Sequence, residues 1–258
     1  MVAAPSLFPT FGPLHLPTAP TATPLDWSRW LLAFSQVQVS IQGQDRLPAD
    51  LPLVIVSNHR SIMDAPLLMR VVNRPVRFAC HHYMGQVPGL RELIKVLDCL
   101  PLDAPGSGQT RFFRQALTAL RQGESVGIFP EGATPMVQRT SPNSLSRFHR
   151  GFAHLALRAP VDELAIVPVA IASQQETSGI EVPLRWLSWF DASEPLFQQS
   201  GWHPAVVYRQ VELRIGRPIR VDSRLRSRDR RPGVSSLVAD ITASCHNEIA
   251  TLLHGTGC

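Results

Sequence analysis

Residues 53–72 read LVIVSNHRSIMDAPLLMRVV, and this stretch decides the fold class of the chain. Its first five residues form a short, continuous apolar run, which is typical of a strand buried on both faces. Residues 65–72 carry the pattern of a helix. A buried strand that passes through a polar turn into a helix predicts an α/β fold, in which helices cover a sheet.

The same alternation continues along the rest of the chain from residue 37. Short apolar or β-branched segments predict strands, and segments with apolar residues at helical spacing predict helices. Strands are expected at 37–41, 76–80, 125–129, 164–172 and 205–215 (one or two strands), and helices at 90–97, 111–121, 152–158 and 237–252. This order predicts a single α/β domain over residues 25–258, with a mostly parallel or mixed sheet.

Residues 1–24 differ from the rest of the chain in carrying six prolines. Proline at this density blocks helices and sheet ladders, so we expect a flexible N-terminal arm. After it, Asp26 is expected to cap a short helix that places Trp27, Trp30 and Phe34 on roughly one face. These aromatic residues either pack onto the core or lie at a membrane interface, where Trp is favoured.

The composition limits the class of protein. The 258 residues are 44% hydrophobic, enough for one sizeable core, and the four cysteines form neither a CxxC pair nor a metal-like spacing with histidine. A reducing cytoplasmic compartment therefore fits best. No apolar stretch approaches the ~20 residues of a membrane-spanning helix, and residues 1–24 lack the features of a signal peptide, so any membrane contact is expected at the surface.

The chain is basic, with a formal net charge of +5 and a pI of about 9.6, and Lys95 is its only lysine. This balance suits nucleic acid, an anionic membrane or an anionic substrate equally. Two segments bear on the choice among these partners. The arginine-rich stretch 214–231 contacts anionic lipid, contacts nucleic acid (although no recognised motif accompanies it) or faces only solvent. Residues 182–190 (VPLRWLSWF) form either a packed loop or a membrane-interface segment.

The first candidate site is the turn that follows the strand 53–57. His59 lies in this turn, at the carboxyl end of a strand, where α/β sheets place their sites. Asp64, in the first turn of the next helix, can hydrogen-bond one imidazole nitrogen and leave the other free to take a proton. No serine nucleophile is evident, so His59 would activate the acceptor's own hydroxyl. Alternatively, Asp64 only caps the helix and His59 is an ordinary loop residue.

The second candidate site is the turn Phe129-Pro130-Glu131-Gly132, which follows the strand predicted at 125–129. Here the chain presents one carboxylate. Glu131 either holds the headgroup of an acceptor or stabilises the loop around His59. If the segment stood alone, Glu131 would be a solvated turn residue.

Taken together, the two motifs resemble the glycerolipid acyltransferase family typified by bacterial 1-acyl-glycerol-3-phosphate acyltransferases. Asn58, His59, Ser61 and Asp64 match its N-H-x-x-x-x-D block, and residues 129–132 match its F-P-E-G block. Further segments look like its second block, its F-K-x-G segment and its V-P-V block: 87–93 with 100–103, 148–151 and 166–169. The resemblance covers roughly residues 37–220.

The resemblance implies a glycerolipid acyltransferase-like fold and direct acyl transfer. The donor would be acyl-CoA or acyl-carrier protein and the acceptor a lysoglycerolipid, with 1-acyl-glycerol-3-phosphate, which yields phosphatidic acid, expected first. We expect a peripheral enzyme on the cytoplasmic face of a membrane, with no metal, no prosthetic group and no nucleic-acid partner. His59 and Asp64 would be catalytic, and the substrate would be bound by Asn58, Arg60, Ser61, Phe129, Pro130, Glu131, Gly132 and Arg150.

Two positions depart from the family pattern. Arginines that are thought to hold the phosphate of the acceptor are replaced by Ala104 and Thr134. Other arginines can take over this role, namely Arg60, Arg111, Arg139, Arg147 or Arg150. Otherwise the acceptor carries no terminal phosphate, as in lyso-phospholipids or lyso-ornithine lipid. A thioesterase that uses water as acceptor and a catalytically silent lipid-binding protein remain as alternative functions.

Overall fold

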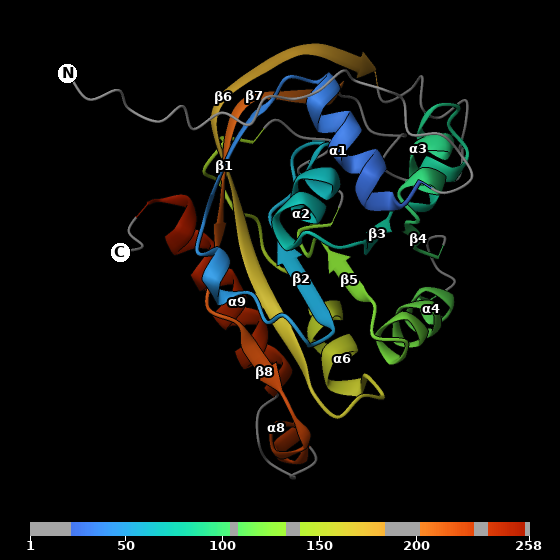
Figure 1. Ribbon diagram of the computed structural model, residues 1–258, viewed down its shortest axis with the longest axis vertical. Coiled ribbons are helices and arrows are strands. Elements are labelled where there is room, and N and C mark those ends of the chain that lie inside the picture. The colour runs from blue at the N-terminus through green and yellow to red at the C-terminus, as the bar shows by residue number, and fades with distance from the viewer. Residues whose placement is uncertain (1–21, 104–107, 133–139, 184–201, 230–236, 256–258) are drawn as a thin grey trace, which may run out of the picture.

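The computed structural model describes residues 22–103, 108–132, 140–183, 202–229 and 237–255. They form one mixed sheet with helices on both faces (Figure 1), which confirms the predicted fold class. The strands are β1 Gln38–Gln42, β2 Leu53–Ser57, β3 Val76–Cys80, β4 Leu100–Pro101, β5 Ser125–Ile128, β6 Leu164–Pro183, β7 Trp202–Ile215 and β8 Ile219–Val221. The helices are α1 Pro24–Phe34, α2 Asp64–Val72, α3 Leu90–Val96, α4 Thr110–Arg121, α6 Gly151–Arg158, α8 Ser223–Asp229 and α9 Leu237–Leu253, with 3₁₀ turns η1 Gln44–Arg46 and η2 His82–Gly85.

The strand order is β1-β7-β6-β2-β5-β3-β4, with β8 paired to β6. Strand β2 lies in the middle and runs parallel to β5 and β6, and β3 runs parallel to β5 and β4. Strands β7 and β8 are antiparallel to β6. Because β2 and β5 are parallel neighbours, the turns that follow them emerge at the same edge of the sheet, and both candidate sites lie there.

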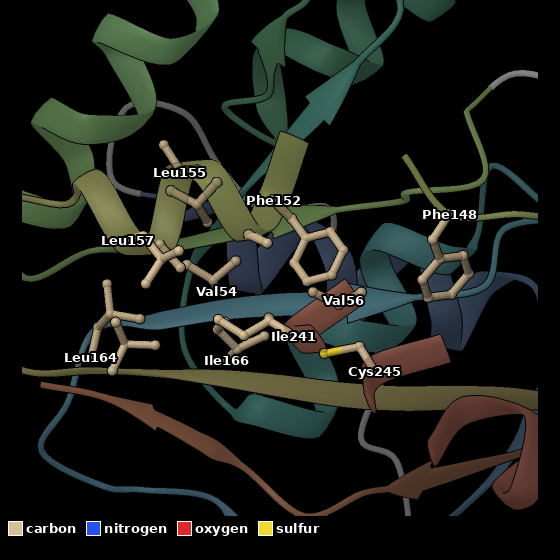
Figure 2. Close-up of a cluster of buried hydrophobic side chains, with 14 of the residues drawn as sticks. Val54, Val56, Phe148, Phe152, Leu155, Leu157, Leu164, Ile166, Ile241 and Cys245 are labelled. Carbon is tan, nitrogen blue, oxygen red and sulfur yellow. The ribbon is translucent and has the colours of Figure 1, made fainter. Parts of the chain in front are cut away.

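The buried strand β2 separates two hydrophobic clusters. Val54 and Val56 face the cluster formed with α4, α6 and α9, whereas Leu53 and Ile55 face the cluster formed with α1 and α2. Every residue of β2 is buried, as its apolar run predicted. Figure 2 shows the first cluster, in which side chains of α6 and α9 surround β2 and β6, among them Phe152, Leu155, Ile241 and Cys245.

Strand β6 continues much further than predicted. The prediction ended at residue 172, but the strand runs to Pro183 and pairs with β7, which is one strand from Trp202. In Figure 1 the two strands form a long curved ribbon beyond the rest of the sheet. The extension was missed because residues 173–179 (SQQETSG) carry no hydrophobic period, and the pairing is irregular at several positions, including those around Gln175. The short elements β4, β8 and α8 were also not predicted.

Helix α1 begins earlier than expected. Thr23 is its N-cap, and the Thr23 side chain accepts a hydrogen bond from the Asp26 backbone while the Asp26 carboxylate accepts one from the Thr23 backbone. This reciprocal pair is a capping box, so the prediction that Asp26 itself caps the helix is wrong by three residues. Pro24, counted with the arm, is the first helical residue. The remainder of the arm, residues 1–21, lies outside the described residues.

Candidate active site

Asn58 sets the point at which the chain leaves β2. Its side-chain amide donates to the carbonyl of Ile171 at 3.0 Å, and its side-chain oxygen accepts from the Ile171 N–H at 2.8 Å. The backbone pairing of β2 with β6 ends at Ser57 and Val169, so the Asn58 side chain continues this ladder as the main chain turns away. Asn58 is buried, and both of its polar atoms stabilise the turn. The structure therefore gives the predicted substrate-binding residue a role in the fold.

His59 and Asp64 form the predicted hydrogen bond. Nδ1 of His59 lies 2.8 Å from Oδ2 of Asp64, which is fully buried at the start of α2. The same oxygen accepts the backbone N–H groups of Arg60 at 2.7 Å and Ser61 at 2.9 Å. An oxygen that accepts these N–H groups acts as a carboxylate, so we place a hydrogen on Nδ1. This tautomer leaves Nε2 of His59 with a lone pair to take a proton.

The other carboxylate oxygen of Asp64 has a partner that the sequence did not reveal. The Tyr208 hydroxyl donates to Oδ1 at 2.9 Å from strand β7. Burial, together with the adjacent Asp64 carboxylate, raises the pKa of Tyr208 well above its usual value, so this hydroxyl stays protonated. Nothing in the local pattern of β7 marks Tyr208. The only signal in the sequence is a general one: a buried tyrosine usually finds a hydrogen-bond partner for its hydroxyl.

Arg60 is held inside the protein. Its guanidinium contacts Glu176 through two bonds, Nη1 to Oε2 at 2.7 Å and Nη2 to Oε1 at 2.9 Å, and also donates to the Thr140 carbonyl. Burial works to lower the pKa of Arg60, but the Glu176 carboxylate outweighs it and raises the pKa. Glu176 already neutralises the charge of Arg60, and a role of Arg60 in substrate binding stays a prediction.

Ser61 also stabilises the loop through hydrogen bonds. Its hydroxyl donates to the Val206 carbonyl of β7 at 2.7 Å and accepts the Met63 N–H at 3.2 Å. Ser61 is buried, and its contact with substrate stays a prediction.

Glu131 stabilises the histidine loop, residues 58–63 between β2 and α2, from the end of the neighbouring strand β5. Its Oε1 accepts the backbone N–H of His59 at 3.0 Å, and its Oε2 accepts the backbone N–H of Ser146 at 2.7 Å. Burial raises the pKa of Glu131, although these two hydrogen bonds and the nearby His59 oppose the shift. Of the three expectations for Glu131, the structure favours support of the loop over a headgroup contact or a solvated turn.

The aromatic ring of Phe129 forms one wall behind His59. The two rings stack with centroids 4.1 Å apart, and Phe129 stacks in turn on Phe78 at 5.4 Å. The next residues complete the turn: the Pro130 carbonyl accepts the His149 N–H at 2.8 Å, and Gly132 has a φ of +70°, a conformation that glycine adopts readily. The predicted residues 129–132 therefore all lie around His59, where they pack against it or stabilise the adjoining turns.

His59 opens onto an apolar cavity of about 820 Å³. Its volume lies in the range of ligand-binding pockets. The wall is lined mostly by aliphatic and aromatic side chains of β3, α3, α4 and α6, among them Phe78, Leu93, Ile94, Leu97, Phe112 and Phe152. Gln109 and His149 are among its few polar residues. Such a cavity suits a long hydrocarbon chain that ends in a reactive group beside His59.

The remaining candidate residues lie at the surface or outside the described residues. Arg111, Arg147 and Arg150 are exposed, and Arg150 is the N-cap of α6, next to the cavity residue Gly151. Ala104, Thr134, Arg139 and most of the segment 182–190 lie outside the described residues.

The part of the chain that the structure describes offers neither a metal site nor a membrane-spanning helix. No group of three or more His, Cys, Asp or Glu in this part of the chain is placed to hold a metal ion. Within the same residues, no helix is both long and apolar enough to span a bilayer.

A histidine that is held by a buried carboxylate and lines an apolar cavity can act as a general base on a substrate with a long apolar part. Residues 38–172, just over half of the chain, match the family model described as Acyltransferase. The chain belongs to this family.

Individual proteins support the same assignment. The chain is 30% identical over 142 residues to the human 1-acyl-sn-glycerol-3-phosphate acyltransferase alpha (54% of this chain, 47% of the relative). It is 22% identical over 145 residues to the Borreliella burgdorferi 1-acyl-sn-glycerol-3-phosphate acyltransferase (56% and 54%). It thus spans about half the length of these curated relatives. The crystal structure of the 1-acyl-sn-glycerophosphate acyltransferase of Thermotoga maritima has a similar fold, with a TM-score of 0.57 at 18% identity over 90% of this chain and 78% of that one.

Proposed function

We propose that this protein transfers a fatty acyl group from an acyl thioester to the free hydroxyl of a lysoglycerolipid. The observation that carries the proposal is the 2.8 Å contact with buried Asp64 of His59, which lines the apolar cavity. The names of the relatives, all 1-acylglycerol-3-phosphate acyltransferases, support 1-acyl-glycerol-3-phosphate as the first acceptor to test. The donor would be acyl-CoA or acyl-carrier protein.

In this proposal His59 is the general base. Its Nε2 takes the proton of the acceptor hydroxyl as that oxygen attacks the thioester carbonyl carbon. The tetrahedral intermediate then collapses, the carbon–sulfur bond breaks, and the thiolate takes the proton from His59. Asp64 keeps the imidazole oriented and stabilises its protonated form. This sequence of steps uses no metal and no prosthetic group.

A specific observation favours a second candidate acceptor, a lyso-lipid without a terminal phosphate. Arg60 was the arginine nearest to His59 that could replace the two missing ones, and its charge is occupied by Glu176. A phosphate-bearing acceptor would then depend on exposed arginines such as Arg150. A panel of acceptors with and without a terminal phosphate distinguishes the two.

The proposal places the enzyme at the cytoplasmic face of a membrane as a peripheral protein. In α1, the Trp30 and Phe34 rings stack, and Phe34 is 69% exposed. A contact of Ser35 with the sulfur of Met63 brings this end of α1 beside Ile62, which is 47% exposed and lines the cavity. Exposed apolar side chains next to the cavity support contact with a lipid surface there.

The first experiment measures acyl transfer from labelled acyl-CoA and acyl-carrier protein to the acceptor panel. His59→Ala is expected to lower the rate by about 10²–10⁴-fold, the usual contribution of a general base. His254→Ala is the matched control, because His254 is exposed at the end of α9, and it should leave the rate unchanged. Retained transfer in folded His59→Ala would overturn the mechanism. Thioester hydrolysis that lyso-lipid does not suppress would indicate a thioesterase, and lipid binding without turnover a silent binding protein.

A second experiment tests the membrane surface by flotation with anionic vesicles. Phe34→Asp should reduce binding, because it places a charge on the exposed end of α1. Thr118→Asp introduces the same charge on an exposed position of α4 and should not. Equal binding of both variants and the unchanged protein would argue against this surface.

A further inference from the structure

The β6–β7 ribbon contacts the histidine loop from behind at three points. Glu176 and Tyr208 are directly opposite each other in the pairing of β6 with β7. Glu176 binds the Arg60 guanidinium, Tyr208 binds the Asp64 carboxylate, and the Val206 carbonyl accepts the Ser61 hydroxyl. Glu176, Val206 and Tyr208 all lie beyond residues 38–172, so this support comes from outside the stretch that matches the family model.

We propose that Tyr208 is a positioning residue of the catalytic base, whose hydroxyl holds the Asp64 carboxylate and thereby tunes how readily His59 takes a proton. The inference rests on the proposed function, in which His59 is the base. It adds a residue from β7 that belongs to neither sequence motif.

The geometry shows what a hydrogen-bond donor to the second carboxylate oxygen of Asp64 contributes. Its Oδ2 accepts three hydrogen bonds, from the His59 ring and from the backbone of Arg60 and Ser61. The terminal torsion of an aspartate is broad and is not fixed by its own rotamer preference. The Tyr208 hydroxyl on Oδ1 fixes the plane of the carboxylate from the opposite side, and so keeps Oδ2 aimed at Nδ1 of His59.

The same bond moderates the charge that His59 experiences. A donor on Oδ1 draws electron density away from Oδ2, so Asp64 stabilises the protonated imidazole less strongly than a carboxylate without this donor. The other charged or titratable groups near His59 include Arg60 with its partner Glu176, Glu131, which accepts the His59 N–H, and His81 and His149, which line the same cavity. Tyr208 forms its printed hydrogen bond with Asp64 and also lies close enough to Arg60 and Glu176 to interact with their charges.

The direction in which the pH profile should shift follows from this weaker stabilisation of protonated His59. Tyr208→Phe leaves Asp64 a stronger partner for protonated His59, so the acid limb of the pH profile of kcat/KM should move to higher pH. A fluorinated tyrosine at position 208 has a more acidic hydroxyl and donates more strongly, so the acid limb should move to lower pH. Opposite shifts from removing and strengthening one hydrogen bond would not arise from a merely structural role.

The test compares unchanged protein, Tyr208→Phe and the fluorotyrosine protein. Tyr208→Phe is expected to lower kcat about tenfold with KM nearly unchanged, since the bond acts on the base and not on substrate binding. The acid limb should rise by roughly half to one pH unit. Thr242→Val is the control: it removes a buried hydroxyl from α9, where Thr242 bonds only to the Val238 carbonyl of its own helix. It should shift neither kcat nor the acid limb.

A second readout does not depend on turnover. Titration of the His59 ring by ¹⁵N NMR, assigned by the loss of its signals in His59→Ala, should show a higher midpoint in Tyr208→Phe and a lower one with fluorotyrosine. Unchanged midpoints and an unchanged pH profile would overturn the role of Tyr208 while leaving the proposed function intact. If the unchanged protein transfers no acyl group, the proposed function fails, and the NMR midpoints alone decide whether Tyr208 tunes His59.

Discussion

The two ends of the central strands hold arginines in contrasting ways. At the carboxyl end of β2, Arg60 is 6% exposed and makes a two-bond contact with Glu176. At the amino end, Arg220 of β8 pairs with Ala165, beside Leu53, and its side chain is 68% exposed in an ion pair with Glu163. The Glu176 side chain is only 16% exposed, so this largely buried pair is held in one geometry, whereas an exposed pair exchanges freely with solvent. Sequence alone made both arginines candidates for binding an anion.

The largest expected effect comes from breaking the buried pair. Glu176→Gln leaves the Arg60 charge without its carboxylate, which typically costs about 3 kcal/mol in the free energy of unfolding. Because Arg60 belongs to the histidine loop, acyl transfer should also fall. Urea unfolding measures the first effect and the transfer assay the second. The double variant Arg60→Met with Glu176→Gln should be more stable than Glu176→Gln alone, and strictly additive losses would contradict the coupling.

The packing behind His59 provides the next test. A Cβ at Gly127 would clash with the ring of Phe78, which stacks on Phe129, and Phe129 stacks on His59. Gly127→Ala should therefore displace this row of rings, destabilise the protein by about 1–3 kcal/mol and lower acyl transfer. Gly85→Ala is the matched control, since its Cβ would meet only Ile94, at 3.9 Å. Equal stability of the two variants would show that the rings move aside without cost.

A smaller effect is expected from pH. Burial would raise the pKa of Glu176, but its bonds to Arg60 and its other partners outweigh burial and hold the pKa below the ordinary value of 4.5. A lowered pKa in the folded state adds stability above pH 4.5 that is lost as the pH falls through the folded value. The free energy of unfolding of the unchanged protein should therefore decline more steeply below pH 4.5 than that of the Arg60→Met, Glu176→Gln variant. Parallel declines would assign the acid sensitivity to other carboxylates.

Local patterns were enough to predict the sheet core and the contact of His59 with Asp64. The apolar run of β2 predicted a buried strand, and the spacing of His59 and Asp64 across a turn predicted their hydrogen bond, because both depend on neighbours in the sequence. The partners of Arg60 and Asp64 could not be predicted. Glu176 and Tyr208 lie 116 and 144 residues away along the chain from their partners. They reach the loop only because β6 continues and pairs irregularly with β7, and residues 173–179 of β6 carry no hydrophobic period that would predict this.

The amino end of the sheet should show the smallest effect. Arg220→Ala removes the exposed pair with Glu163, and such pairs typically contribute about 0.2–1 kcal/mol, less at high salt. Urea unfolding at low and high salt should show a small loss that shrinks as salt is added, and acyl transfer should stay unchanged because Arg220 lies at the end of the sheet opposite His59. A loss near that of Glu176→Gln would mean that exposure does not separate the two arginines. In that case the stability of the fold would depend on the charge of Arg220 at the amino end, as it depends on the charge of Arg60 in the histidine loop.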